Sequence, residues 1–553
     1  ASPALRISVG GYAAGFNEVN DTVRADLVSA ELIAFPVLAV LLLIVFRGVV
    51  AASIPLLVGG LSVAGTFLLL RVMAGLVDTS IFALNISTAL GLGLAVDYGL
   101  LLVSRFREEI ARAGPTREAH RRVVETAGRT VLFSGLTVAA AMAALTLMPQ
   151  RFLYSMGAGG AFVSLFAAFG ALLLVPALLA LLGARVNALS LRRGPAVSDA
   201  SDRWYRLATA VMRRPGVTAL GSMLLLLALA TPLLGVDLIG PGDESIPRGT
   251  PSYVVRDVTA RDYPPGLQVP VNVTLDGRVG GAELVRLRRR IAAIDGVATA
   301  PPFRRVDERT ALASFGLALP ALSEPAQRAV RAIRALDAPV PLLVSGNTAE
   351  FLDLKASLAR RAPVVVAVIA LTTLVLLFLL TGSLVLPLKT LLMNVLTLAA
   401  TLGIIVAAFE WGWLDAPLDY VGPAATDVST IVVLFAVTFG LATDYAVLVL
   451  ARIKELHDAG LSNEEAVASG IARTGRVITA AALCLAAVFV AFTASDVFFM
   501  KQLGLGQAVA VLIDASLVRA LLVPALMRLL GGWNWWAPAP LRRFQRRFGV
   551  TEA

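Results

Sequence analysis

Two aspartates lie inside long apolar stretches of the sequence, and a tyrosine directly follows each of them. Asp97 and Tyr98 occur in GLGLAVDYGLLLV, and Asp444 and Tyr445 occur in FGLATDYAVLVL. An aspartate at the centre of a membrane helix costs roughly 2.5–3.5 kcal/mol on insertion scales, so such residues usually serve a function. A carboxyl group shielded from water can take up and release a proton near neutral pH. We therefore interpret the two Asp-Tyr pairs as a proton relay; the alternative is an aspartate that only hydrogen-bonds a neighbouring helix.

The partners of the two carboxyl groups should come from the other stretch. Adjacent side chains on one helix diverge by about 100°, so Asp97 is expected to meet Tyr445, and Asp444 to meet Tyr98. A tyrosine hydroxyl can donate a hydrogen bond to a carboxylate and stabilise its ionised form. The expected site therefore forms between two helices that are far apart in the sequence.

Small and polar residues near the two pairs are weaker candidates. Gly93 and Gly440 each precede the aspartate by one helical turn and predict close helix packing, although glycine is also common in membrane helices without such a role. Ser134, Thr137 and Thr479 fit a polar lining, but serine and threonine often bond only to their own helix.

A third intramembrane acid, Asp514, lies five residues before Arg519. This spacing predicts a secondary polar site whose expected role is a structural ion pair or hydrogen bond.

The composition is that of a polytopic membrane protein. Of the 553 residues, 57% are hydrophobic and 16% are charged, and the mean hydropathy is +0.79. Several apolar runs approach twenty residues, the length needed to cross a bilayer. The net charge of +10 comes from arginines beside these runs, which argues for membrane topology and against nucleic-acid binding. One cysteine and two histidines, none of them clustered, predict no metal site.

The hydropathy pattern predicts eleven membrane spans. They are expected at 30–46, 49–71, 81–104, 129–148, 155–183, 215–236, 363–381, 385–409, 428–451, 476–495 and 503–530. Arginine-rich loops at 105–129 and 184–214 and the arginine-rich tail should be cytoplasmic, and the tryptophans at 533, 535 and 536 fit an interfacial anchor there. An odd number of spans then places the N-terminus outside.

The predicted organisation has seven parts. They are a remnant of a first outside domain at 1–29, first-half helices at 30–183, a cytoplasmic linker at 184–214, a helix opening the second half at 215–236, a second outside domain at 237–362, second-half helices at 363–530 and a cytoplasmic tail at 531–553. The second outside domain alternates strand-like and amphipathic runs, which predicts a small α/β domain with helices on one sheet face.

An internal repeat relates the two halves. Asp97-Tyr98, Arg105 and Gly128-Arg129 match Asp444-Tyr445, Arg452 and Gly475-Arg476 at one constant offset. The match extends to SVGGYAAGF near the N-terminus, which resembles LVSGNTAEF before the second-half helices. The first half therefore lacks an opening span and most of an outside domain. Two interpretations are open: the sequence is part of a longer chain, or the chain is a truncated or split product and an N-terminal partner fragment or accessory subunits supply the missing part. An intact-mass measurement separates them.

The paired GxxxDY motifs, the repeat and the outside domain together resemble the MMPL family of the resistance–nodulation–division (RND) transporters. Gly93-x-x-x-Asp97 and Gly440-x-x-x-Asp444 fit the GxxxD pattern of the fourth and tenth helices in that superfamily, and GGWNWWAPAPLRR near the C-terminus is also similar. The resemblance covers the whole chain. It implies an α-helical polytopic membrane protein, RND-like with two pseudo-symmetric halves, and a small α/β periplasmic porter domain.

The resemblance also implies a function. It implies a proton-motive-force-driven exporter of lipids, glycolipids or lipophilic siderophores in a bacterial inner membrane, without enzymatic activity, metal or cofactor other than the proton gradient. By carry-over, Asp97, Tyr98, Asp444 and Tyr445 form the proton relay. The alternatives are a lipid-binding receptor or scaffold of the same fold, which would show no proton flux, and an accessory subunit for protein export.

Overall fold

The chain folds into two compact units, which we describe separately. One is a helical bundle formed by residues 23–236 and 362–553, and the other is formed by residues 1–22 and 237–361. The computed structural model describes residues 7–75, 79–190, 198–240, 246–263, 270–418, 420 and 422–548.

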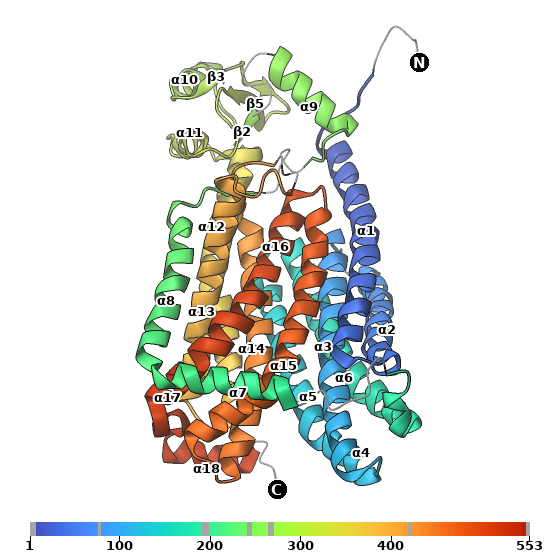
Figure 1. Cartoon of the computed structure of the whole chain (residues 1–553). Helices are drawn as coiled ribbons and strands as arrows, with labels where there is room; N and C mark the ends of the chain where they lie inside the picture. Colours follow the sequence, from blue (N-terminus) through green and yellow to red (C-terminus); the bar gives the residue numbers. More distant parts are fainter. Residues whose placement is uncertain are drawn as a thin grey trace. The chain divides into compact units, whose positions relative to one another are not determined.

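Eleven helices within the described residues are long and apolar enough to cross a membrane, in agreement with the number expected (Figure 1). They are formed by α1 (Tyr12–Phe46), α2 (Val49–Ala74), α3 (Ile81–Ala113), α4 (Arg117–Val123) with η1 (Val124–Gly128) and α5 (Arg129–Ala144), α6 (Arg151–Leu182), α8 (Pro215–Ala230), α12 (Asn347–Thr381), α13 (Val385–Ile405), α14 (Val428–Asp458), α15 (Asn463–Ala491), and α16 (Phe498–Ile513) with η8 (Asp514–Leu522) and α17 (Val523–Leu530).

Several helices extend beyond the spans expected from hydropathy. Helix α1 begins at Tyr12 rather than at residue 30, so much of the segment 1–29 is helical. Helix α15 begins at Asn463 rather than at 476, where the Ser462 hydroxyl accepts a hydrogen bond from the Glu465 amide and caps it. Hydropathy marks only the apolar part of a helix, so the polar turns at its ends are missed.

The segment 184–214, expected as a linker, contains an amphipathic helix. Helix α7 (Ser198–Arg213) packs on α15. The ring of Trp204 lies over Gly475, where an added Cβ would be 2.5 Å from the Trp204 ring. Ala208 and Val211 are buried on the same side. The arginines of this segment therefore belong partly to a helix that is packed against the bundle.

The tail after α17 also packs against the bundle. It contains η9 (Gly531–Trp535) and α18 (Ala539–Phe548). Trp533 and Trp536 are exposed, as an interfacial anchor requires. Trp535 is not a free anchor: its ring stacks on His457 with centroids 4.3 Å apart, and its indole nitrogen donates to Asn463 3.2 Å away.

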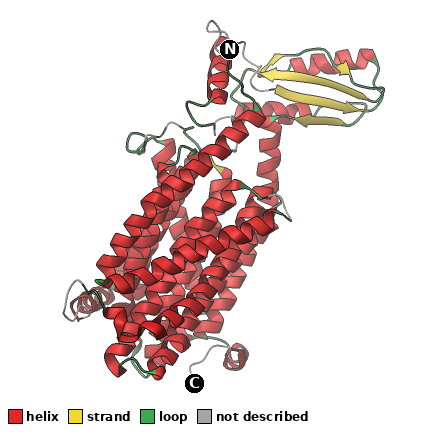
Figure 2. Ribbon diagram, turned by 90° about the vertical axis from the view of Figure 1, so that its right-hand side faces the viewer, coloured by secondary structure: helices red, strands yellow, loops and turns green. Residues whose placement is uncertain are grey.

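The second unit contains an antiparallel sheet with helices on one face, as the alternating sequence pattern predicts. The strands β2 to β6 pair in the order β3-β5-β2-β6, and β4 also pairs with β5. The elements of this unit are β1 (Leu238–Ile239), α9 (Pro251–Asp262), β2 (Pro270–Asp276), α10 (Gly281–Ala292), β3 (Val297–Thr299), β4 (Arg304–Arg305), β5 (Thr310–Leu317), α11 (Glu324–Arg334) and β6 (Leu342–Ser345) (Figure 2).

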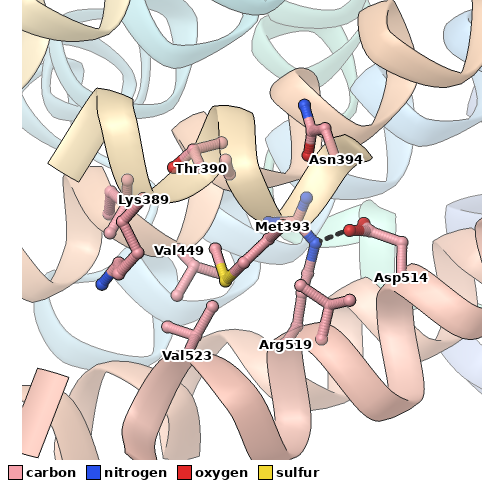
Figure 3. Close-up of a pocket in the computed structure, with 11 residues that line it drawn as sticks. Lys389, Thr390, Met393, Asn394, Val449, Asp514, Arg519 and Val523 are labelled. Carbon is pink, nitrogen blue, oxygen red and sulfur yellow. Dashed lines mark hydrogen bonds and ion pairs between the residues drawn. The ribbon is translucent and has the colours of Figure 1, made fainter. Parts of the chain in front are cut away.

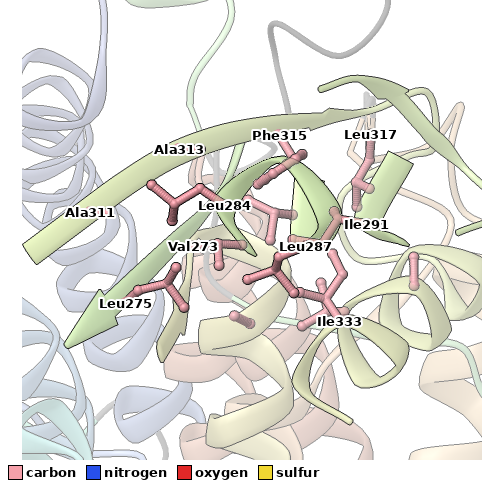
Figure 4. Close-up of a cluster of buried hydrophobic side chains, with 14 of the residues drawn as sticks. Val273, Leu275, Leu284, Leu287, Ile291, Ala311, Ala313, Phe315, Leu317 and Ile333 are labelled. Atoms are coloured by element: carbon pink, nitrogen blue, oxygen red, sulfur yellow. The ribbon is translucent and has the colours of Figure 1, made fainter. Parts of the chain in front are cut away.

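The core of this unit lies between β2, β5 and the two helices α10 and α11 (Figure 4). Val271, Val273 and Leu275 alternate with polar residues along β2, and Phe315 of β5 lies opposite Val271. On the opposite sheet face, the side chains of Asn272 and Ser314 share a hydrogen bond 2.6 Å long in solvent. The two-residue period of the strands therefore separates an apolar face from a polar one.

A matched pair of leucines tests this core. Leu275 is fully buried, whereas Leu343 on the neighbouring strand β6 is 56% exposed. Leu275→Ala should destabilise the unit by about 2–5 kcal/mol through lost packing, and Leu343→Ala should change stability by at most about 0.5 kcal/mol. Hydrogen exchange of residues 270–345, measured by mass spectrometry on the whole chain, reports both. Equal exchange in the two variants would contradict the assigned core.

Candidate functional site

A hydrogen bond joins the two repeats at the centre of the bundle. The Tyr445 hydroxyl on α14 donates to Oδ2 of Asp97 on α3, at 2.7 Å. Both residues are buried, with Asp97 5% and Tyr445 1% exposed. The structure thus contains the contact expected between the aspartate of one half and the tyrosine of the other. Oδ1 of Asp97 has no hydrogen-bond partner among the described residues.

The second pair is linked through a serine. The Ser134 hydroxyl on α5 contacts Oδ1 of Asp444 and lies 3.0 Å from the Tyr98 hydroxyl. A serine hydroxyl carries one proton, so it can donate to only one of these neighbours. A chain in which Tyr98 donates to Ser134 and Ser134 donates to Asp444 satisfies all three groups. Tyr98 and Asp444 are therefore connected, but not by the direct bond that the sequence predicts.

Helix packing across the repeats positions these groups. Helix α14 packs on α5, and α3 packs on α15, so each aspartate-bearing helix lies against a helix of the other half. An added Cβ on Gly440 would be 3.3 Å from the Val138 Cα of α5. An added Cβ on Gly93 would overlap Leu485 of α15. The two glycines therefore lie at the close approaches between the halves.

A buried ion pair lies beside this centre. Nε of Arg519 is 2.6 Å from Oδ2 of Asp514, and both residues are in η8, a stretch of π-helix. The same guanidinium donates to the Ala442 carbonyl and lies 5.6 Å from the centre of the Tyr445 ring. The ion pair expected from the sequence is present. The five-residue spacing of Asp514 and Arg519 does not predict that Arg519 also contacts α14, at Ala442, two residues before Asp444.

The geometry agrees with the comparison with known proteins. The model of the MMPL family matches residues 1–218 and 288–550. The chain belongs to the MMPL family. It is therefore a multi-pass membrane protein of a transporter family, as its motifs predict.

Three relatives illustrate the range of this MMPL similarity. The Streptomyces coelicolor protein SCO6666 is 40% identical over 97% of this chain and 74% of that protein. The trehalose monomycolate exporter MmpL3 of Mycobacterium tuberculosis is 35% identical over 96% of this chain and 61% of that protein. The mycolic acid-containing lipids exporter MmpL11 of Mycolicibacterium smegmatis is 32% identical over 93% and 56%. The chain thus spans less than two thirds of the two exporters, whose names describe transporters and not enzymes.

Sequence reasoning undervalued one residue of this MMPL site. Ser134 was indistinguishable from Thr137 and Thr479, and these two do bond back along their own helices, to Ser134 and Gly475. Ser134 differs from the two threonines because it lies on α5 opposite Asp444. That position follows from the packing of the helices and not from the sequence.

The described residues contain no cluster of three or more histidine, cysteine, aspartate or glutamate side chains that could hold a metal ion. The groups brought together at this site are carboxyl, hydroxyl and guanidinium groups. Such groups can hold, orient and exchange a proton.

The helix approaches around Tyr98 give a test of packing. An added Cβ on Gly135 would be 2.5 Å from the Cβ of Ala168, which has no rotamer to move. Gly135→Ala should therefore lower stability by about 1–3 kcal/mol through overpacking. Gly60 has no atom within 4 Å of an added Cβ, so Gly60→Ala should be neutral or stabilising. Thermal unfolding in detergent compares them, and an unchanged midpoint for Gly135→Ala would count against this packing.

Proposed function

We propose that this MMPL-family chain uses proton entry to drive export of lipids or other lipophilic molecules across a bacterial cell envelope. The observation that carries the proposal is the pair of hydrogen-bonded acids between the halves, with Asp97 bonded to Tyr445 and Asp444 to Ser134. The membrane would be the inner membrane, where a proton gradient is available. Relatives named as exporters of mycolic acid-containing lipids support a lipid substrate.

Protonation of these acids changes the link between the repeats. A carboxylate accepts hydrogen bonds from Tyr445 or Ser134, and such charge-assisted bonds contribute about 1.5–3 kcal/mol. A protonated carboxyl is a weaker acceptor, so loading a proton weakens the bond of Asp97 to Tyr445 on α14 or the bond of Asp444 to Ser134 on α5. Movement of one charge through the membrane potential supplies roughly 2.3 kcal/mol per 100 mV. The energy of one proton is thus comparable with the bond that it weakens.

The chain spans only part of the named exporters, so export also needs a lipid path. We propose that the relay operates within the residues of this chain, and that the lipid path is completed by the rest of a longer chain or by an N-terminal partner fragment or accessory subunits. Proton flux and lipid export are then separable measurements.

The relay acids give the first test. In proteoliposomes with a trapped pH dye and an imposed gradient, Asp97→Asn, Asp444→Asn and Tyr445→Phe should each lower proton flux by about tenfold or more, because each removes a protonatable or donating group. Asp496→Asn, at a surface aspartate, is the control. Wild-type flux in both aspartate variants would refute the relay. Lipid binding without flux in wild type would favour the receptor alternative.

The bridging serine gives a second test. Ser134→Ala should separate Tyr98 from Asp444 and lower flux by about tenfold, without loss of folded protein in size-exclusion chromatography. Ser164 is equally buried, but its hydroxyl bonds to Gly160 on its own helix, so Ser164→Ala should retain flux. If both serine variants behave alike, Ser134 does not act as a bridge.

A further inference from the structure

Two arginines from different halves of the bundle converge on the end of helix α1. Nη1 of Arg107 on α3 donates to the carbonyl oxygen of Phe46 at 2.8 Å. Nη2 of Arg476 on α15 donates to the carbonyl oxygen of Val45 at 2.7 Å. These carbonyls are adjacent in the last turn of α1, and the two guanidinium charges are close enough to repel each other. Arg47, the residue that follows α1, adds a third positive charge that acts on Arg476.

The chain compensates only a small part of this charge. The terminal carbonyl groups of a helix carry the equivalent of about half a negative charge, against three full positive charges. Glu108 and Glu109 follow Arg107 in the sequence, but both pair with Arg105. Within the described part of the chain, the charge that acts on Arg107 is that of another arginine, Arg476, and not that of a carboxylate.

Two cations of the second half have a carboxylate partner instead. Nε of Arg519 is 2.6 Å from Oδ2 of Asp514 (Figure 3), and Nζ of Lys454 is 2.8 Å from Oδ2 of Asp458. A charge that is partly shielded from water needs such a partner to offset its desolvation. The group of arginines at the end of α1 therefore requires an anion.

The internal repeat shows that the first half lacks this partner. At the constant offset between the two motifs, Arg107 of α3 corresponds to Lys454 of α14. The same offset places Ala111 where the second half has Asp458, the residue that neutralises Lys454. The negative charge that the chain itself supplies in one half is therefore missing in the other.

The surroundings of the three arginines favour a lipid over a soluble anion. Ile44 and Val49, on either side of Arg47, are 64% and 44% exposed, so acyl chains can lie against the same turn. The arginine-rich loop 105–129, which follows Arg107, marks this end as cytoplasmic by the positive-inside rule. Guanidinium groups match the geometry of phosphate oxygens, and basic pockets between membrane helices at this face bind anionic lipid headgroups.

We propose that Arg47, Arg107 and Arg476 form a binding site for the phosphate group of an anionic membrane lipid at the cytoplasmic face. The phosphate supplies the negative charge that Asp458 supplies in the second half. Because the arginines belong to the end of α1, to α3 and to α15, the bound lipid ties together helices of both halves. The site depends neither on the proposed proton coupling nor on the exported molecule.

Lipid binding to the whole chain tests this site. Native mass spectrometry of the protein in detergent micelles counts bound phosphatidylglycerol and phosphatidylcholine with matched acyl chains. Wild type should prefer phosphatidylglycerol, and Arg107→Gln should lower this preference about tenfold, because it removes a hydrogen bond between charged groups. Arg129 is exposed and is the first-half counterpart of Arg476, so Arg129→Gln should retain the preference. Equal losses in both variants would indicate general attraction to a basic face and would overturn the site.

Inorganic phosphate distinguishes a lipid from a free anion. A ligand that binds only the folded protein raises the midpoint of thermal unfolding. Phosphatidylglycerol should therefore raise the midpoint of wild type, whereas phosphatidylcholine and inorganic phosphate at the same concentration should not. An equal rise with inorganic phosphate would show that the ligand is a free phosphate and would overturn the assignment to a lipid. No rise with any of the three would overturn the site itself.

An added carboxylate tests the site with all three arginines in place, and it decides the question even if Arg107→Gln fails to fold. Ala111 and Ala113 are both exposed at the end of α3. Ala111→Asp places the charge one turn from Arg107, as Asp458 lies from Lys454, and should lower the preference for phosphatidylglycerol about tenfold. Ala113→Asp adds the same charge out of register and should retain it. An undiminished preference in Ala111→Asp, or equal losses in both variants, would overturn the proposal.

Discussion

The arrangement of the bundle depends on the cost of placing carboxyl groups where no bulk water is present. Asp97 and Asp444 are 5% and 1% exposed, and neither has a basic side chain on its own helix closer than eight residues. A buried polar group must be hydrogen-bonded to offset its desolvation. In this chain the donors come from other helices: Tyr445 for Asp97, and Ser134 for Asp444. The acids therefore couple the two halves as a consequence of being buried.

Helix packing follows from this coupling. Helix α3 packs on α15, and α14 packs on α5. Each helix that carries an aspartate therefore packs on a helix of the other half. Gly93 and Gly440 lie at these crossings, one turn before each aspartate. At Gly440 the close approach of α14 to α5 brings Ser134 within reach of Asp444. Gly93 instead packs against α15, and the donor to Asp97 comes from α14. A change that separates α14 from α5 therefore removes a hydrogen bond as well as packing.

Much of this arrangement follows from the sequence, because its signals are periodic or repeated. The apolar runs predict eleven spans, the alternation along β2 predicts one buried sheet face, and the divergence of adjacent side chains on a helix predicts that Asp97 meets Tyr445 of the other repeat. The role of Ser134 does not follow, because bonding to another helix and bonding to its own helix have the same sequence signature. The packing of α7 on α15 depends on the fit of the Trp204 ring over Gly475. These two residues lie in segments that share no sequence pattern, so the sequence does not predict their contact.

The departures from symmetry carry information that the repeat itself does not. Among the described residues, the first half has a π-helical turn at η1, before α5, and the second half has π-helical turns at η6 (Val406–Glu410) and at η8, within its last span. A π-helical turn displaces side chains relative to a regular helix and often marks a functional site. In η8 it accompanies the buried ion pair of Asp514 and Arg519. No acid occupies the equivalent position in the first half, which has Phe166 there, so the surroundings of the two equivalent aspartates differ although the aspartates themselves repeat.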